Sequence, residues 1–188
     1  MSDTVFLSGS RKITRLNDAI RTRIKNMVDA GMNIVIGDAS GADRVMQEYL
    51  NRVGCRNVTV YCAGDHCRNN IGRWVSRFVQ VDPKLRGRDF FSTKDRAMAA
   101  LADFGFVVWD GKSTGSITNV GELVDRGKKV VIYYSPENGF CTISNKDQFQ
   151  IFLGKKCDPK IHHTIKSGSE NLSKSGTPSL QASMVLDR

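Results

Sequence analysis

The sequence lacks a long apolar run, a secretion signal and a regular cysteine pattern. No apolar stretch approaches the roughly 18 residues of a membrane-spanning helix, and Met1-Ser2-Asp3 leads into a short apolar stretch with no basic region before it. The five cysteines are odd in number and irregularly spaced, which favours reduced thiols over a disulfide framework. We therefore expect a soluble, cytoplasmic protein with no membrane partner.

Two common nucleotide-binding motifs are also missing. Neither the dinucleotide motif G-x-G-x-x-G nor the Walker motif G-x-x-x-x-G-K-[ST] occurs, so the NAD dehydrogenase and ATPase classes lose their main support. His66 lies between Cys62 and Cys67, but this spacing matches no compact zinc module. The sequence thus predicts neither a metal site nor a bound cofactor.

Charge and composition indicate one basic globular domain. The chain has 188 residues, of which 40% are hydrophobic and 25% charged, and its net charge is +9. Dispersed positive charge of this kind indicates affinity for phosphate groups, in free nucleotides or in nucleic acid. Residues after about 159 are rich in Ser, Gly, Lys and Asn, so we predict a domain over 1–158 and a disordered tail over 159–188.

Short apolar runs alternate with helical patterns along the domain. The runs predict strands over 4–8, 33–36, 58–62, 105–109 and 129–133. The helical patterns predict helices over 17–30, 42–53, 93–104 and 117–125. Over 63–92 the pattern is poor, and we expect a long loop or short helices there. The alternation predicts an α/β chain with a Rossmann-like three-layer fold and a mainly parallel sheet.

Small polar residues follow three of the predicted strands, in the stretches 8–11, 37–43 and 110–116. Loops after parallel strands converge at one sheet edge, where glycines let backbone amides approach an anion and the following helix adds its positive end. We therefore predict a phosphate and ribose site. Its ligand-binding candidates are Gly9, Ser10, Arg11, Gly37, Asp38, Gly41, Asp43, Asp110, Gly111, Ser113, Gly115 and Ser116.

Two of these candidates have an alternative interpretation. The Asp38 carboxylate could accept hydrogen bonds from ribose hydroxyls, or it could form an Asx turn or cap a helix. Arg11 could pair with a phosphate, although exposed arginines are mostly solvated. Both alternatives stay open at this point.

Several stretches resemble the Rossmann-like SLOG superfamily. The resemblance lies in Thr93-Lys-Asp-Arg-Ala-Met98, Ala102-Asp103, Phe106-Val-Val-Trp109 and Asp110-Gly-Lys-Ser-Thr-Gly-Ser116. Gly9-Ser10-Arg11 and the loop 37–43 resemble its YspA-like branch in particular. The superfamily includes lysine-decarboxylase-like (LOG) phosphoribohydrolases, the DNA-processing protein DprA and nucleotide-sensing domains. The resemblance implies a nucleotide-binding Rossmann-like domain that self-associates as a homo-oligomer.

The sequence departs from the hydrolase pattern at two positions. In the phosphoribohydrolases an arginine lies four residues before the helix methionine, and a glutamate closes a P-G-G-x-G-T-x-x-E loop. Here Lys94 takes the place of the arginine and Asn119 that of the glutamate, while Glu122 lies one helical turn further on. The resemblance therefore implies Lys94 and Glu122 as catalytic candidates. Asp38 and Asp110 are further candidates, because a carboxylate must stabilise the reacting centre or activate water.

Three functions are compatible with these patterns. The first is binding or sensing of a nucleotide-derived small molecule, such as one resembling ADP-ribose. The second is an enzyme that hydrolyses or transfers at an N-glycosidic bond, like a phosphoribohydrolase or a deoxyribosyltransferase. The third is DprA-like binding of single-stranded nucleic acid, for which the basic rim would be Arg68, Arg73, Arg77, Arg86 and Arg88.

Overall fold

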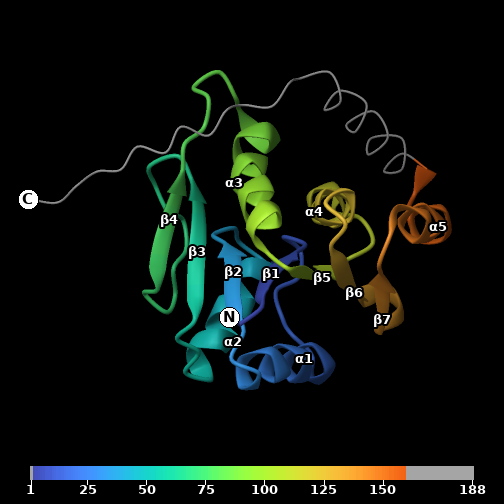
Figure 1. Ribbon diagram of the computed structural model, residues 1–188, viewed down its shortest axis with the longest axis horizontal. Helices are drawn as coiled ribbons and strands as arrows, with labels where there is room; N and C mark the ends of the chain where they lie inside the picture. Colours follow the sequence, from blue (N-terminus) through green and yellow to red (C-terminus); the bar gives the residue numbers. More distant parts are fainter. Residues whose placement is uncertain (1, 160–188) are drawn as a thin grey trace, which may run out of the picture.

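The computed structural model describes residues 2–159, and its centre is one seven-stranded sheet (Figure 1). Across the sheet the strands follow the order β4-β3-β2-β1-β5-β6-β7. All neighbouring strands pair in parallel except β6 and β7, which are antiparallel. The strands are β1 (Thr4–Gly9), β2 (Asn33–Gly37), β3 (Val58–Ala63), β4 (Val75–Val79), β5 (Phe104–Trp109), β6 (Lys129–Tyr134) and β7 (Gly139–Ile143).

Helices cover both faces of this sheet (Figure 1). One face carries α1 (Asp18–Asp29) and α2 (Ala42–Arg52), and the other carries α3 (Gly87–Leu101), α4 (Thr114–Asp125) and α5 (Lys146–Lys156). A 3₁₀ turn, Ser135–Glu137, joins β6 to β7. The structure thus confirms the predicted Rossmann-like three-layer fold. No helix within residues 2–159 is long and apolar enough to cross a membrane.

The apolar first strand shows how one run of residues builds two cores. Val5 and Leu7 belong to the apolar cluster under α1 and α2, whereas Phe6 between them belongs to the cluster under α3, α4 and α5. Successive strand residues point to opposite faces of a sheet, so a run that is apolar throughout is buried on both sides. The following helix begins where expected, because the Asn17 side chain accepts a hydrogen bond from the Ile20 amide at 3.0 Å.

The structure corrects two expectations, one about the stretch 63–92 and one about the cysteines. The stretch 63–92, for which we expect a long loop or short helices, contains the strand β4 and the first turns of α3. Strand β4 forms one edge of the sheet, and its apolar residues Val75 and Phe78 are 71% and 51% exposed. Its sequence therefore lacks the apolar pattern that marks a buried strand. Cys62 and Cys67 form a disulfide, because the turn after β3 brings the second residue back against the strand end. The predicted tail lies outside the described residues, apart from its first residue, Pro159.

The chain changes direction across the sheet between β1 and β5. From β1 it moves outward through β2 and β3 to β4, and α3 then returns it to the other side of β1. Loops at such a switch point diverge and leave a crevice beyond the strand ends. Gly9 closes the base of this crevice, since a Cβ there would lie 2.5 Å from the Ala42 Cβ and 2.7 Å from the Val108 carbonyl oxygen.

We predict that Gly9→Ala lowers the free energy of unfolding by about 1–3 kcal/mol, because the added methyl group overpacks the contact between β1, α2 and β5. Chemical denaturation of the two proteins measures this difference. Gly115→Ala is the matched control, since a Cβ at Gly115 meets no atom within 4 Å. Equal losses of stability in both variants would contradict the packing explanation.

Candidate functional site

A cavity of about 520 Å³ lies at the carboxyl ends of β1 and β5. This volume is within the roughly 300–1,000 Å³ typical of small-molecule sites. Its walls come from the loop after β1, the start of α2, the inner side of α3 and the loop that leads from β5 into α4. The predicted site residues that line it are Gly9, Arg11, Asp43, Lys94, Asp110, Ser113, Gly115 and Ser116.

Hydrogen bonds around Asp110 join the first and third predicted loops. The Ser10 hydroxyl donates to the Asp110 carboxylate at 2.9 Å, and the Asp110 amide donates back to the Ser10 oxygen at 3.1 Å. The same carboxylate accepts hydrogen bonds from the amides of Lys112 and Ser113 at 2.9 and 2.7 Å. Asp110 therefore holds the loop that leads into α4.

These contacts also keep Asp110 ionised. Burial alone would raise the pKa of its carboxyl group. The hydrogen bonds from the Lys112 and Ser113 amides and from the Ser10 hydroxyl favour the charged form, and the net pKa is lowered from its usual value. The Ser10, Lys112 and Ser113 hydrogen bonds all go to one carboxylate oxygen, Oδ1, so this oxygen serves the loop structure.

The N-terminus of α4 opens onto the cavity. Ser113 caps the helix with its side-chain oxygen, and its carbonyl accepts a hydrogen bond from the Trp109 indole at 3.0 Å. Gly115, in the first turn, lines the cavity, and a side chain there would point into open space. The first turn of a helix has free amide donors and a partial positive charge, so this turn is suited to bind an anion.

Cationic side chains surround the same cavity, contributed by Arg11, Lys12, Arg68, Arg88 and Lys112. The Arg88 guanidinium donates to the Thr114 carbonyl oxygen at 3.2 Å, which ties the start of α3 to the start of α4. The ring of Phe91 lies beneath two of the cations, with guanidinium carbons 4.0 Å (Arg68) and 5.8 Å (Arg11) from its centroid. The cavity therefore combines positive charge with one aromatic surface.

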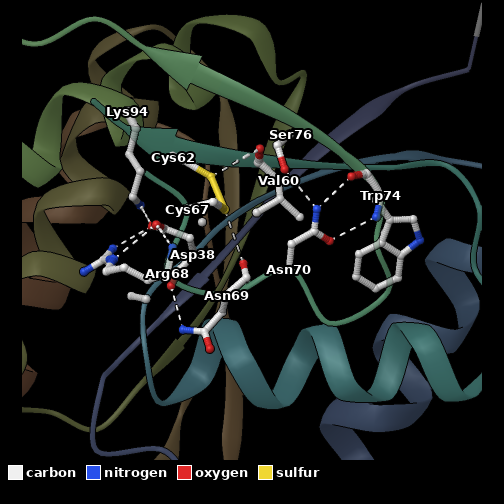
Figure 2. Close-up of a disulfide and its surroundings, with 12 residues drawn as sticks. Asp38, Val60, Cys62, Cys67, Arg68, Asn69, Asn70, Trp74, Ser76 and Lys94 are labelled. Carbon is white, nitrogen blue, oxygen red and sulfur yellow. Dashed lines mark hydrogen bonds and ion pairs between the residues drawn. A yellow bond between two sulfur atoms is a disulfide. The ribbon is translucent and has the colours of Figure 1, made fainter. Parts of the chain in front are cut away.

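A buried ion-pair cluster centred on Asp38 and Lys94 lies beside the cavity, and Figure 2 shows these two residues with Arg68. The Lys94 side chain is 3% exposed, and its ammonium nitrogen lies 2.7 Å from an Asp95 oxygen and 3.9 Å from an Asp38 oxygen. Arg68 binds Asp38 with two guanidinium nitrogens, at 2.6 and 3.1 Å, and with its backbone amide at 3.1 Å. This cluster joins α3, the end of β2 and the loop after β3.

The charges of the cluster are mutually stabilised. Burial would raise the pKa of Asp38, but its hydrogen bonds to Arg68 and the charges of Lys94 and Arg68 outweigh burial and lower it. Burial would lower the pKa of Lys94, but the carboxylates of Asp95, Asp43 and Asp38 reverse the direction and raise it. Both groups are therefore charged at neutral pH.

Asp43 is the carboxyl group of the cluster whose negative charge is least stabilised. Its side chain is nearly buried, and its described hydrogen bond comes from the Ala39 amide at 3.3 Å. Burial, assisted by the negative charges of Asp95 and Asp38, raises the pKa of Asp43 to about 7, against the opposing charge of Lys94. A proton on Asp43 leaves two carboxylates and two cations in the cluster.

The remaining predicted residues lie behind the cavity wall. Ser10 is fully buried, and Asp38 is engaged by Arg68 rather than free for a ribose. Gly37 leaves room for the Asp43 carboxylate, 2.5 Å from where its Cβ would be, and Gly41 has a positive φ where it meets the Arg11 backbone. Gly111 also has a positive φ, in the turn after β5. Among residues 2–159 these positions shape the loops and do not line the cavity.

Glu122 is separated from the predicted site. Its carboxylate pairs with Arg126 at 2.5 Å, one turn along α4, and it does not line the cavity. Asn119, which the hydrolase pattern aligned with the glutamate, lines the cavity and donates to the Ser8 hydroxyl at 2.8 Å. The Glu122 carboxylate is therefore not placed to contact a ligand in this cavity.

Several lining residues were not in the predicted site. Of the basic rim, Arg68 and Arg88 line the cavity, whereas Arg73, Arg77 and Arg86 do not. Phe91 lies in the first turns of α3, which the sequence patterns do not predict as a helix, and Asp95 lies in the predicted part of that helix. A helical pattern extended back to residue 87 would have placed Phe91, Lys94 and Asp95 on neighbouring turns.

The overall fold has a relative among solved structures. DNA processing protein A from Helicobacter pylori, a protein described for its single-stranded DNA binding mode, aligns with a TM-score of 0.54 at 16% identity. The alignment covers 89% of this chain and 80% of that protein. The chain shares the fold of a DNA-processing protein. No protein-family model matches the sequence, and no curated protein matches it.

We predict that Asp43→Asn makes the protein more stable at high pH. The protonated carboxyl stabilises the fold below its ordinary pKa of about 4, and this contribution is lost as the pH rises through about 7. The melting temperature of the variant relative to wild type should therefore be higher at pH 8.5 than at pH 5. Asp65→Asn, at an exposed position, is the control and should show no such trend. A pH-independent difference for Asp43→Asn would contradict the buried charge.

Proposed function

We propose that the chain binds a nucleotide or a nucleotide-derived ligand, of the ADP-ribose type, in the cavity between β1 and β5. One observation carries the proposal: the first turn of α4, with Gly115 facing open space, lies in a cavity whose rim carries arginine and lysine side chains. Helix amides and cations together favour phosphate over neutral ligands. The resemblance to the SLOG superfamily supports the same ligand class.

The two sides of the cavity suit different parts of such a ligand. Phosphates would lie at Gly115, near Lys112 and Arg88, where the positive charge is concentrated. Sugar hydroxyls would lie on the opposite side, near Asp43 and Asp95, which offer carboxyl oxygens. The ring of Phe91 offers an apolar surface for a base, although two guanidinium groups now lie near it.

Binding of single-stranded nucleic acid is the second candidate. It is favoured by the structural likeness to DNA processing protein A and by the net charge of +9. At 16% identity the likeness concerns the fold, so the argument for nucleic acid depends chiefly on charge. An enzymatic role at an N-glycosidic bond has weaker support, since Glu122 lies off the cavity and Asp38 is engaged by Arg68.

Calorimetric titration with ADP-ribose, AMP and a thymidine oligonucleotide tests the proposal. We expect saturable 1:1 binding of at least one of the two small ligands, and a loss of roughly tenfold or more in affinity, about 1.4 kcal/mol, in Gly115→Asp. The new carboxylate would occupy the anion site and repel phosphate. Gly154→Asp is the matched control, because Gly154 also faces open space but lies on α5, away from the cavity.

The outcomes separate the candidates. Binding of the oligonucleotide alone, with affinity that increases with its length and falls steeply with salt, would favour the nucleic-acid function. Equal binding by wild type and Gly115→Asp would contradict the location of the site. Release of free base from AMP, followed by chromatography, would show catalysis.

A further inference from the structure

The disulfide between Cys62 and Cys67 lies near Asp38, Arg68 and Lys94 (Figure 2), and Arg68 and Lys94 line the cavity. Cys62 is fully buried on β3, and Cys67 is half-buried in the loop after that strand. The sulfur atoms and a carboxylate oxygen of Asp38 all lie within 4.8 Å of one another. The disulfide therefore lies next to the ion-pair cluster of Asp38, Arg68 and Lys94.

Arg68 follows Cys67 directly and transmits its position to the cavity. Its amide and guanidinium bind Asp38, while its guanidinium lies over Phe91 and lines the cavity. Cys67, the residue before Arg68, is thus covalently bonded to β3 through Cys62. The Arg68 side chain itself lines the cavity, where a ligand would meet it. A change at Cys67 must alter the backbone on which Arg68 is held.

The segment after Arg68 is firmly attached to the body of the protein. The Asn69 side chain donates to the Asp38 carbonyl oxygen at 2.9 Å, and the Ile71 amide donates to the Gln47 side chain at 3.0 Å. Asp65 and His66, between the two cysteines, are exposed. Movement of Cys67 would therefore be taken up by the exposed turn and by Arg68.

The pair has little to offer as a purely structural crosslink. It joins residues separated by 5 positions, and a crosslink stabilises a fold least when it closes a short loop. Cys67 is only partly buried, in the loop after β3, whereas Cys62 is fully buried on the strand. Short, accessible disulfides of this type suit exchange chemistry.

We propose that Cys62 and Cys67 form a reversible redox switch that sets the position of Arg68 and thereby the affinity of the cavity for a nucleotide phosphate. A thiolate of a dithiol reductant attacks the Cys67 sulfur, the S–S bond breaks, and Cys62 leaves and takes up a proton. The second thiol of the reductant then displaces Cys67. Two electrons move from the reductant, which becomes a disulfide, to the protein, which gains two thiols.

Reduction replaces a covalent bond with a van der Waals contact, so the two sulfur atoms move apart. Cys62 is fixed within β3, and Cys67 must therefore move outward and carry the Arg68 backbone with it. The bidentate contact with Asp38 then weakens, and the cavity loses an ordered cation. The inference rests on the proposed nucleotide binding and adds a control to that same site.

Calorimetry with ADP-ribose on the full chain tests this, with oxidised and dithiol-reduced protein titrated in parallel. We expect wild type to bind ADP-ribose at least threefold more weakly after reduction. The variants Cys62→Ser and Cys67→Ser should bind as weakly as reduced wild type, with or without the dithiol. Cys141→Ser is the matched control and should keep the response, since Cys141 is unpaired and lies on β7. Alkylation followed by mass spectrometry verifies which thiols are free in each sample.

A second measurement keeps the two proposals distinguishable. If neither form binds ADP-ribose or AMP, the proposed function is wrong, and the backbone amide resonance of Arg68 decides on the switch. A shift of that resonance on reduction in wild type, absent in Cys67→Ser, would support the switch. Equal affinity and an unchanged Arg68 resonance in fully reduced protein would overturn it, as would failure of the disulfide to be reduced by the dithiol in folded protein.

Discussion

The buried ammonium group of Lys94 is the constraint on which the cavity depends. A lysine that is 3% exposed must be compensated by negative charge, and here it comes from Asp95 on α3, Asp43 on α2 and Asp38 directly after β2. Satisfying one cation thus fixes the distance between α3 and the ends of the central strands. Asp38 extends the arrangement to Arg68 and to the loop after β3. The cavity exists because these four segments are held together at one edge of the sheet.

The architecture was predictable because it depends on short-range patterns. Continuous apolar runs such as Thr4–Gly9 are typical of strands buried on both faces, and the alternation with helices predicts a parallel sheet. Strand β4 escaped prediction because an edge strand needs little burial and shows no alternation. The first turns of α3 escaped it for a similar reason, since Gly87 and the charged residues after it face solvent.

The candidate site was predictable in location but not in the role of each residue. The glycines of the loops after β1 and β2 were expected to approach a ligand, yet Gly9, Gly37 and Gly41 make room for protein atoms. Asp38 could not be assigned from the sequence, because its partner Arg68 lies 30 residues away and is brought back by the turn after β3. The disulfide likewise depends on that turn, which no local pattern encodes. Contacts between distant segments decide which polar residues are used by the fold and which remain open to a ligand.

The most direct test of the account is to map a ligand by backbone amide resonances during titration with ADP-ribose. We predict that the largest changes occur at Gly115 and Ser116 in the first turn of α4, followed by Arg11 and Arg68 around the cavity. Changes of this kind would place phosphate at the helix terminus between β1 and β5. Changes confined to β4 or α5, with Gly115 unaffected at saturation, would contradict the central claim.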